Sequence, residues 1–197
     1  MNSREHVLKA VHRQQPDRVP TYLWLTPALT ERLRIERGVI DYESYFQMDI
    51  RFTEYRAQEE HLDFSPYVGH YHSGTTIDSW GCGTYPVGYY HFTKAQCPLE
   101  TATSVAEIQA YPFTEQQPDI TAIHEQVKAI QADELLACSQ YECGTFEQAH
   151  ALMGMESLLA NMVSSTSMVK ALFERISDVK ARMAAAYVEA GVDMLWI

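Results

Sequence analysis

The sequence predicts an α/β protein, because strand-like and helix-like segments alternate along its 197 residues. The strand-like segments are continuously apolar, which is typical of parallel strands covered on both faces. We expect four of them, at 19–25, 48–55, 135–141 and 192–197. A (β/α)8 barrel has eight strands and usually takes about 250 residues. The four segments therefore indicate a partial (β/α)8 TIM barrel, about the first four strands, which lie parallel in one sheet.

The first third of the chain carries start and stop signals for helices. A helix is expected over 3–14, where apolar residues recur at helical spacing. It ends before Pro16, because the residue before a proline is pushed out of the helical region. A second helix is expected over 28–37, since Thr26 followed by proline suits a helix start and Gly38 suits a left-handed stop.

Residues 67–98 differ in character, with five glycines among many tyrosines, threonines and histidines. This composition predicts a β-hairpin excursion outside the barrel wall. Within it, Asp78, Trp80 and Gly81 are expected to form a turn, in which aspartate binds the turn backbone and glycine permits a positive φ. Further helices are expected at 104–110, 118–132, 145–152, 155–162 and 167–190.

The charge balance argues against two classes of partner. The chain has 15 Lys and Arg against 26 Asp and Glu, a net charge of -11, whereas nucleic acids and anionic membranes attract clustered basic side chains. No apolar run reaches the roughly 18 residues of a membrane span, and the N-terminus lacks the apolar region of a secretory signal. We therefore expect a cytoplasmic protein with a single domain, residues 1–197, and neither nucleic acid nor membrane as partner.

Two patterns could hold a metal ion, and we prefer a structural interpretation of both. His70 and His72 would share one face of a strand and could ligate zinc, but their surroundings are typical of a hairpin surface. The cysteines are not in C-x-x-C spacing and suit half-buried thiols. They are Cys82, Cys97, Cys138 and Cys143. We expect no metal ligands in this chain.

The final segment, 192–197, has the character of an interior strand, yet no crossover helix follows it. In α/β proteins such a strand normally leads into a loop and a covering helix. We therefore expect a barrel domain truncated at its C-terminus. The alternative is an edge strand at a natural terminus.

Six passages stand in a recognisable order along the chain. They are SREHVLKAVHRQQPDRVPTYLW at 3–24, MDI at 48–50, DSWG at 78–81, PL at 98–99 with SVAEI at 104–108 and YP at 111–112, GTFEQA at 144–149 with LMG at 152–154, and AGVD at 190–193. Together they resemble the uroporphyrinogen decarboxylase-like superfamily. The resemblance covers the whole chain, which looks like the N-terminal half of a family barrel.

The resemblance implies an enzyme that acts on a tetrapyrrole or a corrinoid-linked substrate at the barrel mouth. One branch comprises uroporphyrinogen decarboxylases, lyases that carry an arginine-rich segment after the first strand; the other comprises corrinoid-dependent methyltransferases. Here Leu25–Leu29 contains no arginine to bind substrate carboxylates. The methyltransferase-like branch is therefore favoured. The alternatives are a uroporphyrinogen decarboxylase of porphyrin biosynthesis and an inactive or oligomer-forming half-barrel fragment.

The resemblance also bears on cofactors and partners. The methyltransferases place their zinc ligands in the second half of the barrel, so we expect no cofactor in this chain. Zinc and a corrinoid could belong to a full-length methyltransferase-like form. The expected partners are a small-molecule or tetrapyrrole substrate, a corrinoid protein and a second copy in a homo-oligomer.

Four residues are candidates for catalysis. Asp49 matches a strand-end aspartate that accepts hydrogen bonds from pyrrole N–H groups in the decarboxylases, and His150 falls near the place of their catalytic tyrosine. Tyr141 and Glu142 follow the third expected strand, at the carboxyl end where barrel sites lie. We expect these four side chains to cluster at that end of the sheet.

Overall fold

A computed structural model describes residues 1–89, 92–141 and 144–197. The chain packs as two compact units, which are described separately. The first unit comprises Met1–Arg56, Asp119–Tyr141 and Ala185–Trp196. The second unit comprises Ala57–Pro118 and the described part of Glu142–Ala184. Among the described residues, no helix has the length and hydrophobicity needed to cross a membrane.

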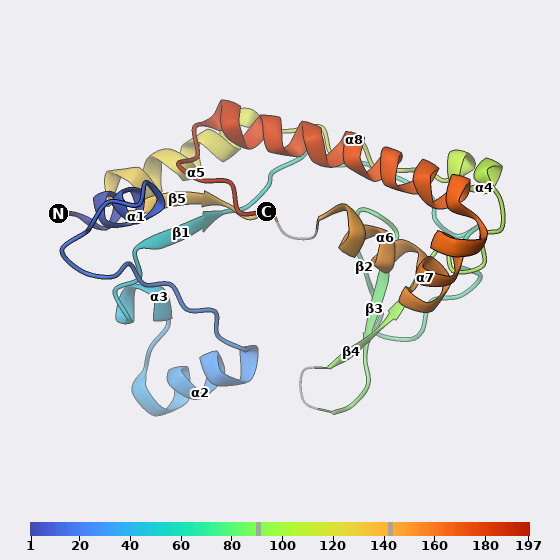
Figure 1. The fold of residues 1–197 in the computed structure, drawn as a ribbon. Helices are drawn as coiled ribbons and strands as arrows, with labels where there is room; N and C mark the ends of the chain where they lie inside the picture. The colour runs from blue at the N-terminus through green and yellow to red at the C-terminus, as the bar shows by residue number, and fades with distance from the viewer. Residues whose placement is uncertain (90–91, 142–143) are drawn as a thin grey trace. The chain divides into compact units, whose positions relative to one another are not determined.

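The first unit is built on a parallel pair of strands, β1 (Ile50–Thr53) and β5 (Leu136–Ser139). Met194 adds a parallel bridge beside Cys138 of β5. The strands expected within 48–55 and 135–141 are thus confirmed as parallel neighbours, and the segment 192–197 contributes this one bridge. The result is an α/β unit in which α1 and α5 both pack on β1 and β5. In Figure 1, α5 lies above the two strands, and α2 and α3 lie below them.

The strand expected at 19–25 is wrong. These residues form no ladder with β1 or β5. A single backbone bond, in which Asp49 N donates to Thr21 O at 3.0 Å, joins the segment to the start of β1. The aromatic side chains that suggested a buried strand pack instead against β1, with the Tyr22 ring centroid 5.0 Å from that of Phe52. Side-chain packing therefore replaces the strand pairing that the pattern predicted.

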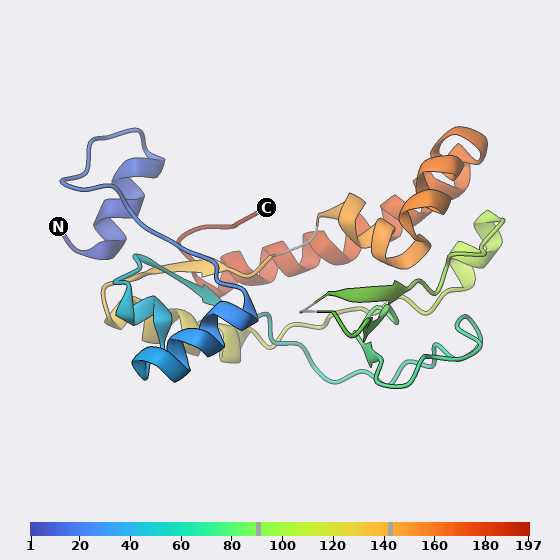
Figure 2. The ribbon, with the colours of Figure 1, turned by 90° about the horizontal axis from the view of Figure 1, so that it is seen from below.

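Capping residues set the helix boundaries in the first unit. The elements are α1 (Ser3–Val11), α2 (Pro27–Arg37), α3 (Tyr42–Tyr45), α5 (Ile120–Ala132) and the C-terminal part of α8 (Thr166–Ala190). Thr26 caps α2 and Gly38 closes it with φ +67°, as expected from the sequence. Seen from below, α2 and α3 lie in front of the sheet (Figure 2).

The two faces of the sheet bury different sets of side chains. On one face Ile50, Leu136 and Cys138 form a cluster with Val7 of α1. This arrangement follows from the alternation of side chains along a strand, since residues two apart share a face. Phe52, two residues after Ile50, packs against the same cluster.

A second cluster joins α5 to the C-terminal part of α8. It is formed by Ile123, Tyr187 and Ala190. The Tyr187 hydroxyl donates to the backbone oxygens of Thr53 and Gln140, each at 3.3 Å. Because these oxygens follow the two strands, this hydroxyl ties the helix to the carboxyl end of the sheet.

The second unit contains a three-stranded antiparallel sheet, which confirms the predicted hairpin excursion at 67–98. Its strands are β2 (Thr76–Ile77), β3 (Gly83–Pro86) and β4 (Thr93–Gln96). Asp78 Oδ1 accepts from Trp80 N at 2.9 Å and from Cys82 N at 2.8 Å, and Gly81 has φ +79°. The expected turn at Asp78 is therefore confirmed.

Helices complete the second unit. They are α4 (Val105–Ala110), α6 (Thr145–Met153), α7 (Met155–Ser164) and the N-terminal part of α8. Ser104 caps α4, and the Glu107 carboxylate accepts from Ser104 Oγ and from Thr103 N, each at 2.8 Å. The helix expected at 104–110 thus begins directly after its cap, Ser104.

Candidate functional site

The first unit contains a hollow of about 420 Å³ beside the carboxyl ends of its strands. We call it the aromatic cleft. Its lining residues are Tyr22, Trp24, Ile40, Asp41, Tyr42, Glu43, Phe52 and Gln140. All eight belong to the first unit. A volume of this size is typical of a small-molecule site.

Four segments bring these residues together. β1 supplies Phe52, and Gln140 directly follows β5, where its N–H donates to Thr53 O at 3.1 Å. The extended segment after Pro20 supplies Tyr22 and Trp24. The start of α3 supplies the acidic wall. The cleft thus lies where the carboxyl ends of two parallel strands meet the start of the short helix α3.

The walls of the aromatic cleft are rings in tilted or edge-to-face contact. The centroid of Phe52 lies 5.0 Å from that of Tyr22 and 6.1 Å from that of Trp24. Trp196 extends the cluster at 5.4 Å from Phe52. Trp24 is 58% exposed and Trp196 is 46% exposed. Large aromatic side chains left this accessible in one cluster mark a binding surface more often than a folding core.

Two carboxylates line the same cleft. Asp41 caps α3, with Oδ1 accepting from Ser44 N at 3.0 Å, and hydrogen bonding by Ser44 lowers the pKa of Asp41. Burial raises the pKa of Glu43, and this effect outweighs the opposing charge of Arg51, whose Nε lies 3.4 Å from Glu43 Oε2. The cleft therefore holds one carboxylate whose pKa is lowered and one whose pKa is raised.

Arg51 is the basic residue paired with this wall, but it does not line the cleft. Its Nη1 donates to the backbone oxygens of Met48 and Ile50, each at 3.1 Å. Its Nη2 donates to Ser44 Oγ at 3.2 Å. The guanidinium is thus turned toward these acceptors, and none of the eight lining residues is basic.

Comparison with known proteins supports the fold. No protein-family model matches the chain, and no curated protein sequence matches it. A solved structure, a methyltransferase from Methanosarcina mazei, is similar to 99% of this chain with a TM-score of 0.60 and 12% sequence identity. The chain spans 58% of the length of that methyltransferase. The likeness shows that the two share an α/β fold.

Asp49 lies at the opposite end of the sheet from the aromatic cleft, so its expected place at the strand carboxyl ends is wrong. It directly precedes β1, and its backbone oxygen accepts from Leu136 N, the first residue of β5. Its carboxylate is completely buried and accepts a two-pronged bond from Arg18 and a 2.7 Å bond from Thr21 N. These contacts tie the N-terminal segment to the sheet, which is a structural role.

Of the other three candidates, two lie in different units and one lies outside the described residues. Tyr141 follows β5 at the expected end, but its side chain packs against the cluster of Ile123, Tyr187 and Ala190, on the side of α5 and α8. Burial raises the pKa of Tyr141. His150 lies in α6 of the second unit. Glu142 lies outside the described residues.

Sequence reasoning missed most of the residues that line the aromatic cleft. Tyr22 and Trp24 were interpreted as core residues of a buried strand, and no sequence motif singled out Asp41 or Glu43. One signal could have found Gln140. It stands beside Tyr141 directly after a predicted strand, where α/β sites concentrate.

The hairpin histidines have neighbours within the second unit. The His72 ring lies against that of Tyr85, with centroids 4.4 Å apart, and Gln96 Nε2 donates to the backbone oxygen of His70 at 3.0 Å. Within 1–89, 92–141 and 144–197, no group of three or more His, Cys, Asp or Glu side chains is placed to hold a metal ion. The described residues therefore do not fit a zinc site.

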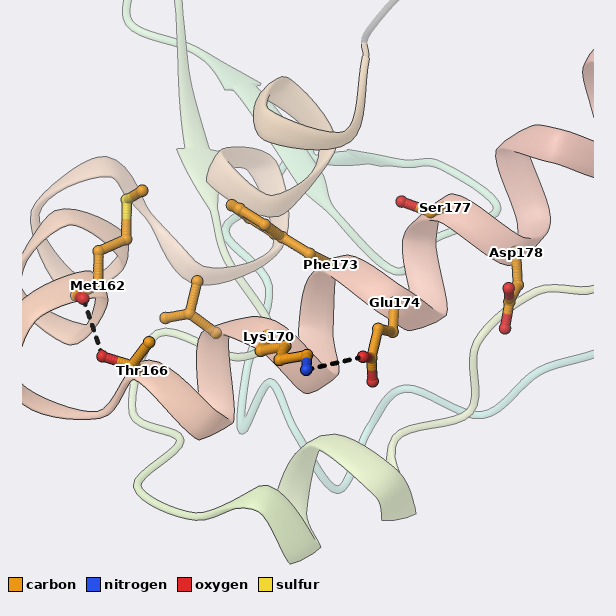
Figure 3. Close-up of a pocket in the computed structure, with 8 residues that line it drawn as sticks. Met162, Thr166, Lys170, Phe173, Glu174, Ser177 and Asp178 are labelled. Carbon is orange, nitrogen blue, oxygen red and sulfur yellow. Dashed lines mark hydrogen bonds and ion pairs between the residues drawn. The ribbon is translucent and has the colours of Figure 1, made fainter.

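A second hollow, of about 500 Å³, lies on α7 and α8 in the second unit (Figure 3). Its polar groups are largely paired within the helices: Thr166 Oγ1 donates to Met162 O at 3.2 Å, and Lys170 Nζ lies 3.8 Å from Glu174 Oε1. The other lining residues are Val169, Phe173, Ser177 and Asp178. These contacts leave a mainly apolar hollow, so the aromatic cleft is the better candidate site.

Proposed function

We propose that this chain is the substrate-holding part of a methyltransferase-like enzyme, built as part of a (β/α)8 barrel, and that the aromatic cleft binds a small methyl-bearing substrate. The single observation that carries the proposal is a cleft with ring walls and an acidic rim at the carboxyl ends of parallel strands. Barrel enzymes bind their substrates at that end. The fold shared with a methyltransferase supports the same choice.

The lining of the cleft favours methyl groups over carboxylates. Ring faces and edges contact methyl groups closely and exclude water from them. A polycarboxylate would meet Asp41 and Glu43 and no basic lining residue, a repulsive arrangement. The segment Leu25–Leu29, where the decarboxylase resemblance would need arginines, forms the capped start of α2 instead. These features argue against uroporphyrinogen decarboxylase.

Each wall of the cleft has a distinct role in this proposal. Trp24 and Phe52 pack against the methyl group, and Gln140 offers an amide that can donate to or accept from the rest of the substrate. Asp41 and Glu43 make the electrostatic potential in the cleft negative. A corrinoid, when bound by a partner protein, would supply the methyl acceptor. The described residues do not fit zinc, so these roles are limited to binding and orientation.

Binding of small methyl compounds to the purified 197-residue chain tests the proposal. We expect at least one of 4-methoxyphenol, dimethyl sulfide and choline to change the tryptophan fluorescence saturably, and uroporphyrin, an octacarboxylate, to cause no saturable change. Replacing Trp24 by alanine should weaken that binding about tenfold or more, because a central aromatic contact is lost. Trp24 is mainly exposed, so its truncation should leave the fold intact.

Ile35→Ala serves as the matched control, since Ile35 is also an exposed apolar residue of the first unit and does not line the cleft. It should bind like the unmodified chain. Saturable binding of uroporphyrin that Trp24→Ala abolishes would overturn the proposal. Failure of all three methyl compounds to bind would overturn it as well.

A further inference from the structure

We infer that the aromatic cleft selects a cationic head group, a methylated ammonium carried by a small molecule. The inference rests on the proposed function and deepens it, because it names the class of methyl-bearing substrate. Two independent features of the cleft carry it: the arrangement of its rings and the sign of its charges.

The rings present differently oriented surfaces to the cleft. The plane of Tyr22 makes an angle of 79° with that of Trp24 and 58° with that of Phe52, and Trp24 and Phe52 meet at 62°. A cation is attracted to the electron-rich face of a ring within about 6 Å of its centroid. Rings at steep angles can surround a rounded, methylated cation, whereas stacked rings would leave only a flat slot.

The charges of the cleft also favour a cation. Asp41 and Glu43 both line it, from the first turn of α3 and the residue that caps it. Arg51, the basic residue paired with this wall, contacts Glu43 and three uncharged oxygen acceptors, and its charge also acts on Asp41. One guanidinium thus faces two carboxylates, so a net negative charge remains. A hollow with ring walls and a residual negative charge attracts a cation and repels an anion.

Methylation of the cation suits this lining better than a bare ammonium. A bare ammonium is strongly hydrated and needs hydrogen-bond acceptors on every N–H. In a quaternary ammonium the charge is spread over methyl groups that can lie directly against Tyr22, Trp24 and Phe52. Recognition of such ions by aromatic side chains follows from the ring quadrupole.

A pair of probes with the same shape and different charge tests the inference. Choline and 3,3-dimethylbutan-1-ol differ in that a trimethylammonium replaces a tert-butyl group. We expect choline to bind the full chain at least about tenfold more tightly, as measured by calorimetric or fluorescence titration. Raising the salt concentration should weaken choline binding and leave the neutral probe unchanged.

Three substitutions separate charge from shape. Asp41→Asn keeps a helix cap, because asparagine caps as well as aspartate. It should nevertheless weaken the binding of choline severalfold and leave the affinity for the neutral probe unchanged. Glu43→Gln should do the same. Trp24→Leu keeps an apolar wall without a ring quadrupole, so it should reduce the preference for choline over its neutral isostere. Glu36→Gln, at an exposed carboxylate of α2 that does not line the cleft, is the control and should change neither affinity.

The outcomes distinguish the two proposals. If the neutral probe binds as tightly as choline, or if Asp41→Asn and Glu43→Gln leave choline affinity unchanged, the cationic assignment is overturned and the methyl-binding function stands. If neither these probes nor the other methyl compounds bind, both are overturned. If a peptide with trimethyl-lysine binds while choline does not, the small-molecule assignment is overturned in favour of a protein ligand.

Discussion

Replacing Arg18 by alanine is expected to lower the free energy of unfolding by at least about 2 kcal/mol. The substitution leaves the carboxylate of Asp49 without its charged partner. This carboxylate is completely buried and receives two hydrogen bonds from the Arg18 guanidinium. A buried charge that loses its partner costs far more than an exposed one. The bonds from Thr21 N and Thr21 Oγ1 carry no charge, and His6 Nδ1 lies 3.8 Å from Asp49 Oδ1, beyond hydrogen-bond distance.

The pH dependence of stability measures the contact between Arg18 and Asp49 independently. Burial by itself would raise the pKa of Asp49, but the hydrogen bonds from Arg18 and Thr21 N outweigh it and hold the pKa below its ordinary value. A lowered folded-state pKa stabilises the fold above the unfolded-state pKa, and this stabilisation is lost as the pH falls through the folded-state pKa. In Arg18→Ala this acid-dependent stabilisation should shrink.

Urea unfolding followed by circular dichroism measures both effects. Arg32→Ala is the control, because Arg32 pairs with Glu36 on the exposed surface of α2, where an ion pair contributes little. We expect a change below about 0.5 kcal/mol for that variant. Equal stability losses for the two arginine variants would show that Asp49 is not held by Arg18.

Replacing Gly81 by alanine is expected to destabilise the second unit by roughly 2–5 kcal/mol. Gly81 has φ +79°, which an L side chain adopts with strain, and a Cβ there would lie 2.6 Å from Phe64 Cγ and also collide with Tyr111 Oη. Both neighbours are rings, and the Tyr111 hydroxyl is anchored by its bond to Trp80 O. The collision therefore cannot be relieved by a small rotation.

Gly88→Ala isolates the backbone part of this cost. Gly88 has a similar φ of +75°, but no atom of the described residues lies within 4 Å of the position that a Cβ would occupy. We expect a loss of about 1–2 kcal/mol, from conformational strain alone. Thermal unfolding of the two variants compares them directly. If Gly81→Ala is no less stable than Gly88→Ala, the packing around Gly81 is looser than described.

Local signals in the sequence predicted the helices and the parallel strand pair well. Thr26 and Gly38 bound α2, and Ser104 starts α4, because capping depends on a few neighbouring residues. The apolar runs that became β1 and β5 pair in parallel, as expected. The glycine-rich stretch 67–98 forms antiparallel strands, because its turn residues act locally.

Features that depend on distant contacts were not predictable in this way. The segment 19–25 has a strand-like composition, but whether it joins a ladder depends on partners far along the chain. Asp49 was placed at the carboxyl end by the family resemblance alone, although the expected strand 48–55 already had it near the amino end, and it directly precedes β1. The aromatic cleft needs β1, β5 and α3 to meet, so no single motif marks it.

The most direct test of the central claim is to locate a methyl-bearing ligand by the indole N–H signals of the chain in two-dimensional NMR. The three tryptophans give three signals; Trp24 lines the aromatic cleft, Trp196 packs beside it, and Trp80 lies in the second unit. We expect choline to shift the Trp24 signal saturably and to leave Trp80 in place, with each signal assigned by substitution. A saturable shift of Trp80 with Trp24 unmoved would contradict the proposed site, and so would the absence of any Trp24 shift with choline, 4-methoxyphenol and dimethyl sulfide.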